Sequence, residues 1–305
     1  MDSNKIEADP PAQRRSTSER LLVAYARRFP IRRGKLRIVD LFWQTTLGGS
    51  DKRRVATLKY GGFQMSCDLS EILQRQFYFF GTYFLEEDVL ACWQTMAKGA
   101  KMVLDVGANA GIYSLAALAV QSDATIHAFE PTPEIAERLR TTAKLNGLKH
   151  LYVHEAAVSK RAGTATLRRF RGELGTNEGM NFVSEDGVDA VGEKVQTVSL
   201  DQFCEERSID NVDLLKVDIQ GHEYAALQGA EQLIRAGRIS TIFMELNWAQ
   251  QANSICPATE SVQFLEQSHY LFSKPGKHLI WKPAGDWLRA MNDVIARRVL
   301  PYHEA

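Results

Sequence analysis

Two apolar segments, about one helix length apart, constrain the fold of this chain more than any other feature. The first, Val103–Val106, runs into the glycine-rich turn Gly107–Gly111. The second, Thr125–Phe129, ends at Glu130. Glycine lacks a Cβ and tolerates positive φ, so it suits a turn at which the backbone approaches a ligand. An acid roughly 20 residues beyond such a turn is the arrangement by which α/β folds bring a carboxylate to a ribose diol. The pair predicts a strand, helix and second strand that bind an adenosine-containing ligand.

The composition of the turn distinguishes between such ligands. A dinucleotide fingerprint, G-x-G-x-x-G, places a pyrophosphate on the helix N-terminus. Here the turn reads Gly-Ala-Asn-Ala-Gly and Asp105 precedes it. The carboxylate of Asp105 would repel a pyrophosphate but suits a cationic amino-acid ligand, and S-adenosylmethionine fits. The alternative is that residues 105 to 111 form only a tight turn, and Glu130 weighs against it. The residues expected to bind this cofactor are Asp105, Gly107, Asn109, Gly111, Glu130 and Pro131.

The net charge is zero but unevenly distributed. Residues 1–60 carry 14 Lys or Arg against 6 Asp or Glu, and the remainder carries 23 against 31. A basic segment is typical of an arm for nucleic acid or an anionic membrane. No interleaving of aromatic and basic residues marks a nucleic-acid surface. We therefore favour an extension whose charge docks on its own acidic domain, and we expect no nucleic-acid partner.

Other signals concern location and metals. We recognise no signal peptide and no apolar run of membrane-spanning length. The four cysteines show no C-x-x-C spacing, which is typical of a reduced, cytoplasmic protein. No H-x-x-H or H-E-x-x-H pattern occurs, so we expect no dedicated metal site.

Strand and helix patterns alternate through most of the chain. They predict an α/β fold with a doubly wound, mostly parallel sheet covered by helices on both faces. Strands are expected at 102–106, 125–130, 151–157, 212–218 and 240–246, and helices at 111–121, 133–146, 199–207, 222–236 and 259–268. The segments Tyr270–Lys274 and His278–Trp281, separated by Pro275-Gly276, predict a closing antiparallel hairpin.

The same patterns suggest four regions. We expect a disordered tail at 1–19, a basic extension of helices and strands at 20–80, the main domain at 81–283 and a C-terminal helical tail at 284–305. An insertion at 163–198 contains two weak strands, at 164–170 and 195–198, and a glycine-punctuated polar loop between them. Long loops of this kind are often functional, so we expect Thr176 and Asn177 to contact substrate.

A second constellation ends the strand at 212–218. Lys216 and Asp218 are two apart in an apolar segment, where burial is costly unless the charges are paired or used. Asp218 should lie on the same sheet edge as Gly107, because ligands bind beyond the carboxyl ends of parallel strands. Alternatives remain for the neighbours: Lys216 neutralises an internal carboxylate, His222 faces solvent, and Glu223 stabilises its own helix.

These residues complete a pattern that resembles the FkbM family of S-adenosylmethionine-dependent methyltransferases. The matching segments are Leu104–Leu115, Phe129–Pro133, Leu145-Asn146, Ala156–Val158, Leu200-Asp201, Lys216–Glu223 and Leu227–Ala230. The resemblance implies a class I Rossmann-like methyltransferase fold and O-methylation of a hydroxyl on a natural product, sugar or lipid-linked glycan. The family pattern usually has Glu where this chain has Gln220. An amide exchanges hydrogen bonds but cannot act as a base or a strong metal ligand.

Asp218 is the leading candidate to orient or deprotonate the acceptor hydroxyl. Lys216, His222 and Glu223 are expected to support it. Glu245 ends the strand at 240–246 and is expected to pair with Lys216 or to contact substrate. Two other functions stay open at this point: a nicotinamide-dependent oxidoreductase, and a non-catalytic binding protein that retains the fold.

Overall fold

The computed structural model describes residues 16–47, 52–169, 171–172, 175–176, 182–184, 192–246 and 258–299. Within these ranges, no helix has both the length and the apolar character needed to cross a membrane.

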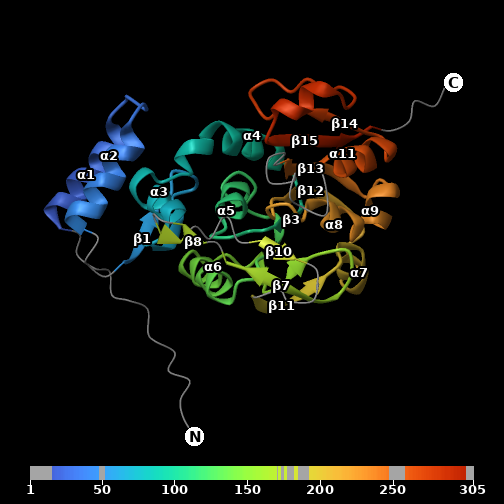
Figure 1. The fold of residues 1–305 in the computed structure, drawn as a ribbon, viewed down its shortest axis with the longest axis horizontal. Helices are drawn as coiled ribbons and strands as arrows, with labels where there is room; N and C mark the ends of the chain where they lie inside the picture. The colour runs from blue at the N-terminus through green and yellow to red at the C-terminus, as the bar shows by residue number, and fades with distance from the viewer. Residues whose placement is uncertain are drawn as a thin grey trace, which may run out of the picture.

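A sheet of seven strands forms the centre of the molecule (Figure 1). Its strand order is β14-β15-β13-β12-β3-β4-β5. Only β15 runs antiparallel to its neighbours, and the other adjacent strands pair in parallel. The mostly parallel sheet confirms the predicted fold class. The strands are β3 (Met102–Val106), β4 (Thr125–Phe129), β5 (Leu151–His154), β12 (Val212–Val217), β13 (Ile239–Glu245), β14 (Tyr270–Ser273) and β15 (Asp293–Arg298).

Helices cover both faces of this sheet because consecutive strand residues point to opposite sides. Val103 joins the core that contains α4 and α5, whereas its neighbour Leu104 joins the core that contains α7, α8 and α11. The helices around the sheet are α4 (Glu87–Ala97), α5 (Ile112–Leu118), α6 (Pro133–Leu145), α7 (Leu200–Glu206), α8 (Glu223–Gln228), α9 (Glu231–Arg235) and α11 (Ala258–Gln267). The single helix expected at 222–236 is thus two helices. The chain breaks at Gly229, where a Cβ would overlap the carbonyl oxygen of Ser159.

The predicted antiparallel closing strand is present, but its partner differs from the prediction. The strand β14 pairs with β15, whereas residues 278–281 are not a strand and Phe272 also forms an isolated antiparallel bridge with Lys282. The strand β15 lies in the segment expected to be a helical tail, where the structure has one short 3-10 helix, η4 (Asp286–Ala290). The strand β15 pairs with β13 and β14 along its two edges, and the cores on both faces of the sheet bury three consecutive residues, 294–296. Such a short continuous apolar run has neither a strand nor a helix periodicity.

The N-terminal extension contains the expected helices and strands. Its elements are α1 (Thr17–Arg28), α2 (Lys35–Phe42), the π-helical turn η1 (Trp43–Leu47), β1 (Arg53–Thr57), β2 (Gln64–Asp68), α3 (Ile72–Phe80) and η2 (Phe84–Glu86). Ser16 accepts a hydrogen bond from the Glu19 amide and caps α1, so residues 17–19 of the expected tail are helical. Residues 1–15 lie outside the described part. The aromatic cluster of α3 is buried, and α1 packs against it with Leu22 and Ala26.

The insertion forms a small second sheet of order β10-β7-β11-β6, below the main sheet in the view of Figure 1. Its strands are β6 (Ala157–Val158), β7 (Gly163–Arg168), β10 (Phe182–Ser184) and β11 (Glu193–Val198), and a separate ribbon consists of β8 (Arg171–Gly172) and β9 (Gly175–Thr176). The two expected strands correspond to β7 and β11. Asn177 lies outside the described residues, and only the backbone of Thr176 is described, where it pairs with Arg171.

Candidate functional site

The turn after β3 is fixed to the neighbouring strand. The amides of Gly107 and Ala108 both donate to the carbonyl of Phe129, at 3.1 and 2.9 Å. Gly107, Asn109 and Gly111 adopt positive φ values of 77°, 49° and 83°. The turn therefore has one defined shape at the carboxyl ends of β3 and β4.

The two glycines are required by the protein's own packing. A Cβ on Gly107 would overlap the carbonyl oxygen of Asp218, and one on Gly111 would overlap the side chain of Leu139. From the sequence alone, the approach of a ligand explains these glycines. The structure gives a further reason, because Gly107 brings the end of β12 directly against the turn.

Glu130 closes the other side of the turn. Its side chain is buried, and its Oε2 accepts from the Asn109 amide at 3.1 Å while Oε1 accepts from the Thr132 amide at 2.8 Å. Pro131 lies between these contacts, and α6 begins immediately after Thr132. A carboxylate oxygen has two lone pairs, so Glu130 can hold the turn and still accept a further hydrogen bond from a hydroxyl.

Asp105 lies beneath the site, with no solvent-exposed surface. Its Oδ2 accepts from the Ser114 hydroxyl at 2.6 Å, and its Oδ1 lies 3.9 Å from the Lys216 ammonium. Oδ1 has no hydrogen-bond partner within the described structure. Burial raises the pKa of Asp105, although the positive charge of Lys216 acts to lower it. The expected contact between Asp105 and a cofactor stays a prediction.

Lys216 is paired, as expected for a buried cation. Its Nζ donates to Asp218 Oδ2 at 3.1 Å and lies 4.5 Å from the centre of the Tyr113 ring. Burial lowers the pKa of Lys216, but the charges of Asp218 and Asp105 outweigh this effect and raise it. Lys216 therefore carries its positive charge between two carboxyl groups.

Gln220 links Asp218 to Glu245. Its Nε2 donates to Asp218 Oδ1 at 3.2 Å and to Glu245 Oε2 at 2.8 Å. The Gln220 amide thus acts as a shared donor to both carboxyl groups. Glu245 contacts Gln220 and Asp218, whereas its predicted pairing with Lys216 is not among the described ion pairs.

The two carboxyl groups differ in protonation. Burial, together with the charge of Asp218 and a hydrogen bond to it, raises the pKa of Glu245 to about 9. Burial also acts to raise the pKa of Asp218, but Lys216 and the hydrogen bonds from Glu245 and Gln220 outweigh it and lower the value. At neutral pH, Asp218 is ionised and Glu245 is neutral. The side chain of Asp218 is 35% exposed, so a ligand can reach it.

Two further carboxyl groups surround this pair, and sequence reasoning missed both. Glu245 faces Asp293 across the β13–β15 register, and burial with the charges of Glu86 and Asp218 raises the pKa of Asp293 to about 7. Glu86 accepts from the Tyr113 hydroxyl at 2.8 Å, and burial raises its pKa. The sequence patterns do not indicate Asp293 because it lies in β15, a strand that they do not predict. They do not indicate Glu86 because it precedes the first strand of the main sheet. Within the described ranges, no group of three or more His, Cys, Asp or Glu is arranged to hold a metal ion.

His222 and Glu223 make contacts away from the Asp218 carboxylate. The Nε2 of buried His222 lies 3.0 Å from the Ser159 hydroxyl, at the end of β6. Glu223 Oε1 accepts from the amides of Ile219 and Gly221, at 3.2 and 3.0 Å, and burial raises its pKa to about 7. These contacts match the alternative in which Glu223 stabilises the start of its helix, and they exclude a solvent-facing His222.

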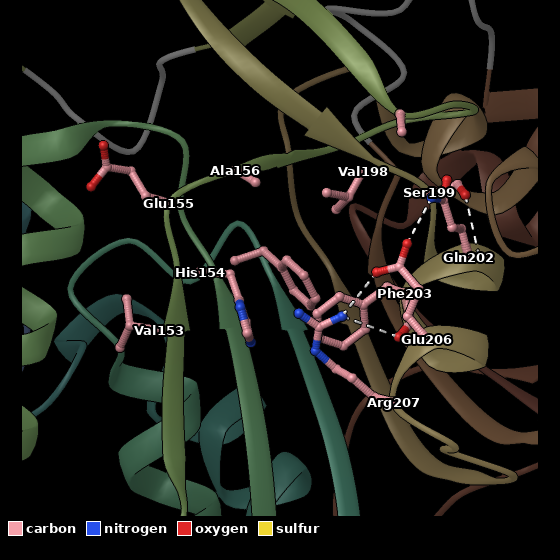
Figure 2. Close-up of a pocket in the computed structure, with 12 residues that line it drawn as sticks. Val153, His154, Glu155, Ala156, Val198, Ser199, Gln202, Phe203, Glu206 and Arg207 are labelled. Atoms are coloured by element: carbon pink, nitrogen blue, oxygen red, sulfur yellow. Dashed lines mark hydrogen bonds and ion pairs between the residues drawn. The ribbon is translucent and has the colours of Figure 1, made fainter.

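A cavity of about 350 Å³ lies between β5, the end of β11 and α7 (Figure 2). His154, Phe203 and Arg207 contribute to its wall, and the Arg207 guanidinium lies 4.0 Å from the centre of the Phe203 ring. None of the predicted site residues lines it. The cavity is therefore separate from the Asp218 group.

Residues 105–272 match the model of the methyltransferase FkbM domain. The chain belongs to the FkbM methyltransferase family. The matched range contains the turn after β3 and the carboxyl groups at 218, 223 and 245. The FkbM-domain match thus confirms the resemblance found in the sequence.

Three curated relatives are similar to this chain in sequence. The 2-O-methyltransferase NoeI of Sinorhizobium fredii is 27% identical over 158 residues, which cover 47% of this chain and 63% of NoeI. The 31-O-demethyl-FK506 methyltransferase FkbM of Streptomyces tacrolimicus is 32% identical over 159 residues, which cover 43% of this chain and 59% of that protein. The hexuronic acid methyltransferase AglP of Haloferax volcanii is 24% identical over 170 residues, covering 53% and 62%. The chain spans about three fifths of the length of these relatives.

Proposed function

We propose that this protein transfers the methyl group of S-adenosylmethionine to a hydroxyl oxygen of a natural product, sugar or glycan. The observation that carries the proposal is the partly exposed carboxylate of Asp218, which pairs with Lys216 at 3.1 Å and whose backbone packs against Gly107 of the turn. The relatives support it, since their names describe a 2-O-methyltransferase, a 31-O-demethyl-FK506 methyltransferase and a hexuronic acid methyltransferase.

The charge of the site fits this donor. S-adenosylmethionine supplies an electrophilic methyl group on a cationic sulfur, together with an ammonium group. The backbone of Asp218 packs against the turn, Glu130 accepts from the Asn109 amide of the turn, and Lys216 is already paired with Asp218. Such an excess of carboxyl groups attracts a cation and repels a phosphate.

We assign the donor's ribose hydroxyls to Glu130. Pro131 and the backbone of Gly107, Asn109 and Gly111 would shape the surface on which the donor lies. Asp105 would act on the donor's amino-acid end through its charge, because its side chain is covered by Ser114.

Asp218 would accept the proton of the acceptor hydroxyl as the oxygen bonds to the methyl carbon and the carbon–sulfur bond breaks. An aliphatic hydroxyl is too weak an acid to ionise beforehand, so a base acts during transfer. Lys216 keeps Asp218 ionised until that step, and neutral Glu245 donates a hydrogen bond to it. The remaining acceleration comes from aligning the two reactants and excluding water.

The remaining predicted residues would act less directly. His222 and Glu223 would position the segment that carries Asp218, through Ser159 and the amides of Ile219 and Gly221. We assign acceptor contacts to the loop that contains Thr176 and Asn177. We also propose that the catalytic domain runs from residue 81 to residue 298, since β15 belongs to the main sheet.

Neither earlier alternative gains support from these contacts. A nicotinamide dinucleotide carries phosphates, which the carboxyl groups around the turn would repel. A non-catalytic binding protein would not need the opposite protonation states of Asp218 and Glu245.

The test combines donor binding with product detection. Calorimetry should show binding of S-adenosylmethionine, and binding should be weaker in the Glu130→Ala variant. Donor with an isotopically labelled methyl group, incubated with hydroxylated natural products and glycans, should give a labelled ether detected by mass spectrometry. The Asp218→Asn variant is the matched control and should bind the donor without forming product. Failure of the wild-type protein to bind the donor would refute the proposal, and donor binding without any labelled product would favour the non-catalytic alternative.

A further inference from the structure

The outer side of the α1–α2 pair has an unusual concentration of exposed apolar side chains. Of the ten large apolar side chains exposed in the described chain, five lie between residues 21 and 41. They are Leu21, Phe29, Ile31, Ile38 and Leu41, with exposed fractions from 44% to 67%. The pair forms one end of the molecule, at the left of Figure 1. A concentration of this kind is typical of a surface that binds another structure.

Exposed arginines accompany these side chains. They are Arg20, Arg28, Arg33 and Arg37, and none of their guanidinium groups has a hydrogen bond or ion pair to another described residue. Other basic residues of the extension are used internally. Arg27 donates to the carbonyls of Thr57 and Tyr78, and Arg32 pairs with Glu87 at 3.0 Å. The expectation that the extension docks its charge on its own domain therefore holds for Arg32 but not for the four exposed arginines.

The apolar and basic side chains share the same side of each helix. In α1, Arg20 and Leu21 are exposed while Leu22 and Ala26 are buried in the core. In α2, residues 37, 38 and 41 are exposed while Val39 is buried. Each helix thus has one side packed on the protein and one side that offers apolar groups next to cations.

We propose that this outer surface, the exposed residues of 20–41, binds the surface of an anionic lipid bilayer. The apolar side chains would enter the boundary between headgroups and acyl chains, and the arginines would contact lipid phosphates. The helices would lie on the membrane, in keeping with their short lengths of 12 and 8 residues. This proposal does not depend on methyl transfer.

Two other occupants fit less well. A symmetric second copy would bring together two sets of arginines that have no ion pair among the described residues, and their repulsion would oppose association. A nucleic acid would use the arginines but leave the aliphatic side chains Leu21, Ile38 and Leu41 in water. An anionic bilayer satisfies both kinds of side chain at once.

The test is flotation with lipid vesicles. The full chain should bind vesicles of equimolar phosphatidylcholine and phosphatidylglycerol, bind pure phosphatidylcholine much more weakly, and dissociate as salt is added. Replacing Arg20, Arg28 and Arg37 by Gln should weaken partitioning on the order of 100-fold, since each basic residue contributes roughly fivefold. The triple variant Leu21→Ser, Ile38→Ser and Leu41→Ser should lose tenfold or more.

Matched controls come from exposed residues outside the extension. Ile280→Ser, at a site that is 71% exposed, and Arg289→Gln, at a side chain that is 76% exposed, should leave vesicle binding unchanged. A Leu41→Trp variant adds a direct readout, because its fluorescence should shift to the blue only with anionic vesicles. Absence of vesicle binding at low salt, or equal losses in the controls, would overturn the proposal. So would a dimer in solution that the triple serine variant dissociates, if the wild type does not bind vesicles.

Discussion

Replacing one carboxyl group at a time tests whether Asp218 acts as the base and Glu245 as a hydrogen-bond donor to it. Asp218→Asn removes the only member of the pair that is ionised at neutral pH, together with its ion pair to Lys216 at 3.1 Å. General-base assistance contributes about 10²–10⁴-fold in rate, which corresponds to roughly 3–5 kcal/mol of activation free energy. We expect a loss of turnover in this range and a change of less than about tenfold in donor affinity.

Glu245→Gln should behave differently. At neutral pH Glu245 is protonated and donates to Asp218, and an amide at this position donates in the same way. Turnover should therefore stay within about tenfold of the wild type.

The pH profile separates the two roles. Wild-type turnover should fall in acid as Asp218 becomes protonated, below the ordinary range of an aspartate because its pKa is lowered. Near pH 9 Glu245 ionises, which removes its hydrogen bond, adds a negative neighbour and makes Asp218 a stronger base. Turnover should therefore step upward there, and Glu245→Gln should abolish the step.

Single-turnover rates with labelled donor, measured from acid to alkaline pH for both variants, provide the assay. Donor affinity by calorimetry is the control for a changed binding site. The reasoning is refuted if Glu245→Gln loses as much turnover at neutral pH as Asp218→Asn. It is also refuted if Asp218→Asn keeps wild-type turnover.

Three other substitutions test the packing around the site. Gly107→Ala should lower the free energy of unfolding by about 3 kcal/mol or more, because a Cβ there overlaps the Asp218 carbonyl and the φ of 77° is strained for alanine. Chemical denaturation of Gly147→Ala, at a φ of 62° and with open space, should show a loss of only about 1–2 kcal/mol, and equal losses would contradict the overlap. Glu130→Ala should lower the free energy of unfolding by about 2–4 kcal/mol, because two backbone amides lose a charged acceptor, and it should weaken donor binding at least tenfold. An unchanged free energy of unfolding together with an unchanged donor affinity would show that Glu130 contributes neither to the turn nor to the site. Burial lowers the pKa of His127 from 6.5 to about 4, so the folded state loses stability as pH falls through this interval. His127→Phe should reduce that loss by up to about 3 kcal/mol. An unchanged dependence of stability on acid pH would show that His127 does not contribute to the loss.

Local patterns in the sequence were sufficient for the centre of the fold. The apolar runs that became β3, β4, β12 and β13 alternate with helix patterns, which indicates strands of a parallel sheet, and parallel pairing puts their carboxyl ends on one edge. The ion pair of Lys216 with Asp218 follows from the same reasoning, because two charges in a buried strand need partners.

The remaining features depend on contacts between distant segments. The strand β15 is stabilised by neighbours on both sides rather than by its own pattern, so the sequence indicated a tail where the structure has a central strand. Asp293 reaches Glu245 only through that pairing. The direction of the His222 side chain likewise depends on Ser159, which lies 63 positions earlier in the sequence.

The sequence by itself determined the strand and turn framework, the acid that follows it and the family. Tertiary structure alone decided that Gly107 is needed to admit the Asp218 carbonyl, and that Glu245 keeps its proton while Asp218 loses one. Periodicity and spacing are local properties that a single segment displays. Steric overlap and pKa depend on which atoms the fold brings within a few ångströms, and no single segment contains that information.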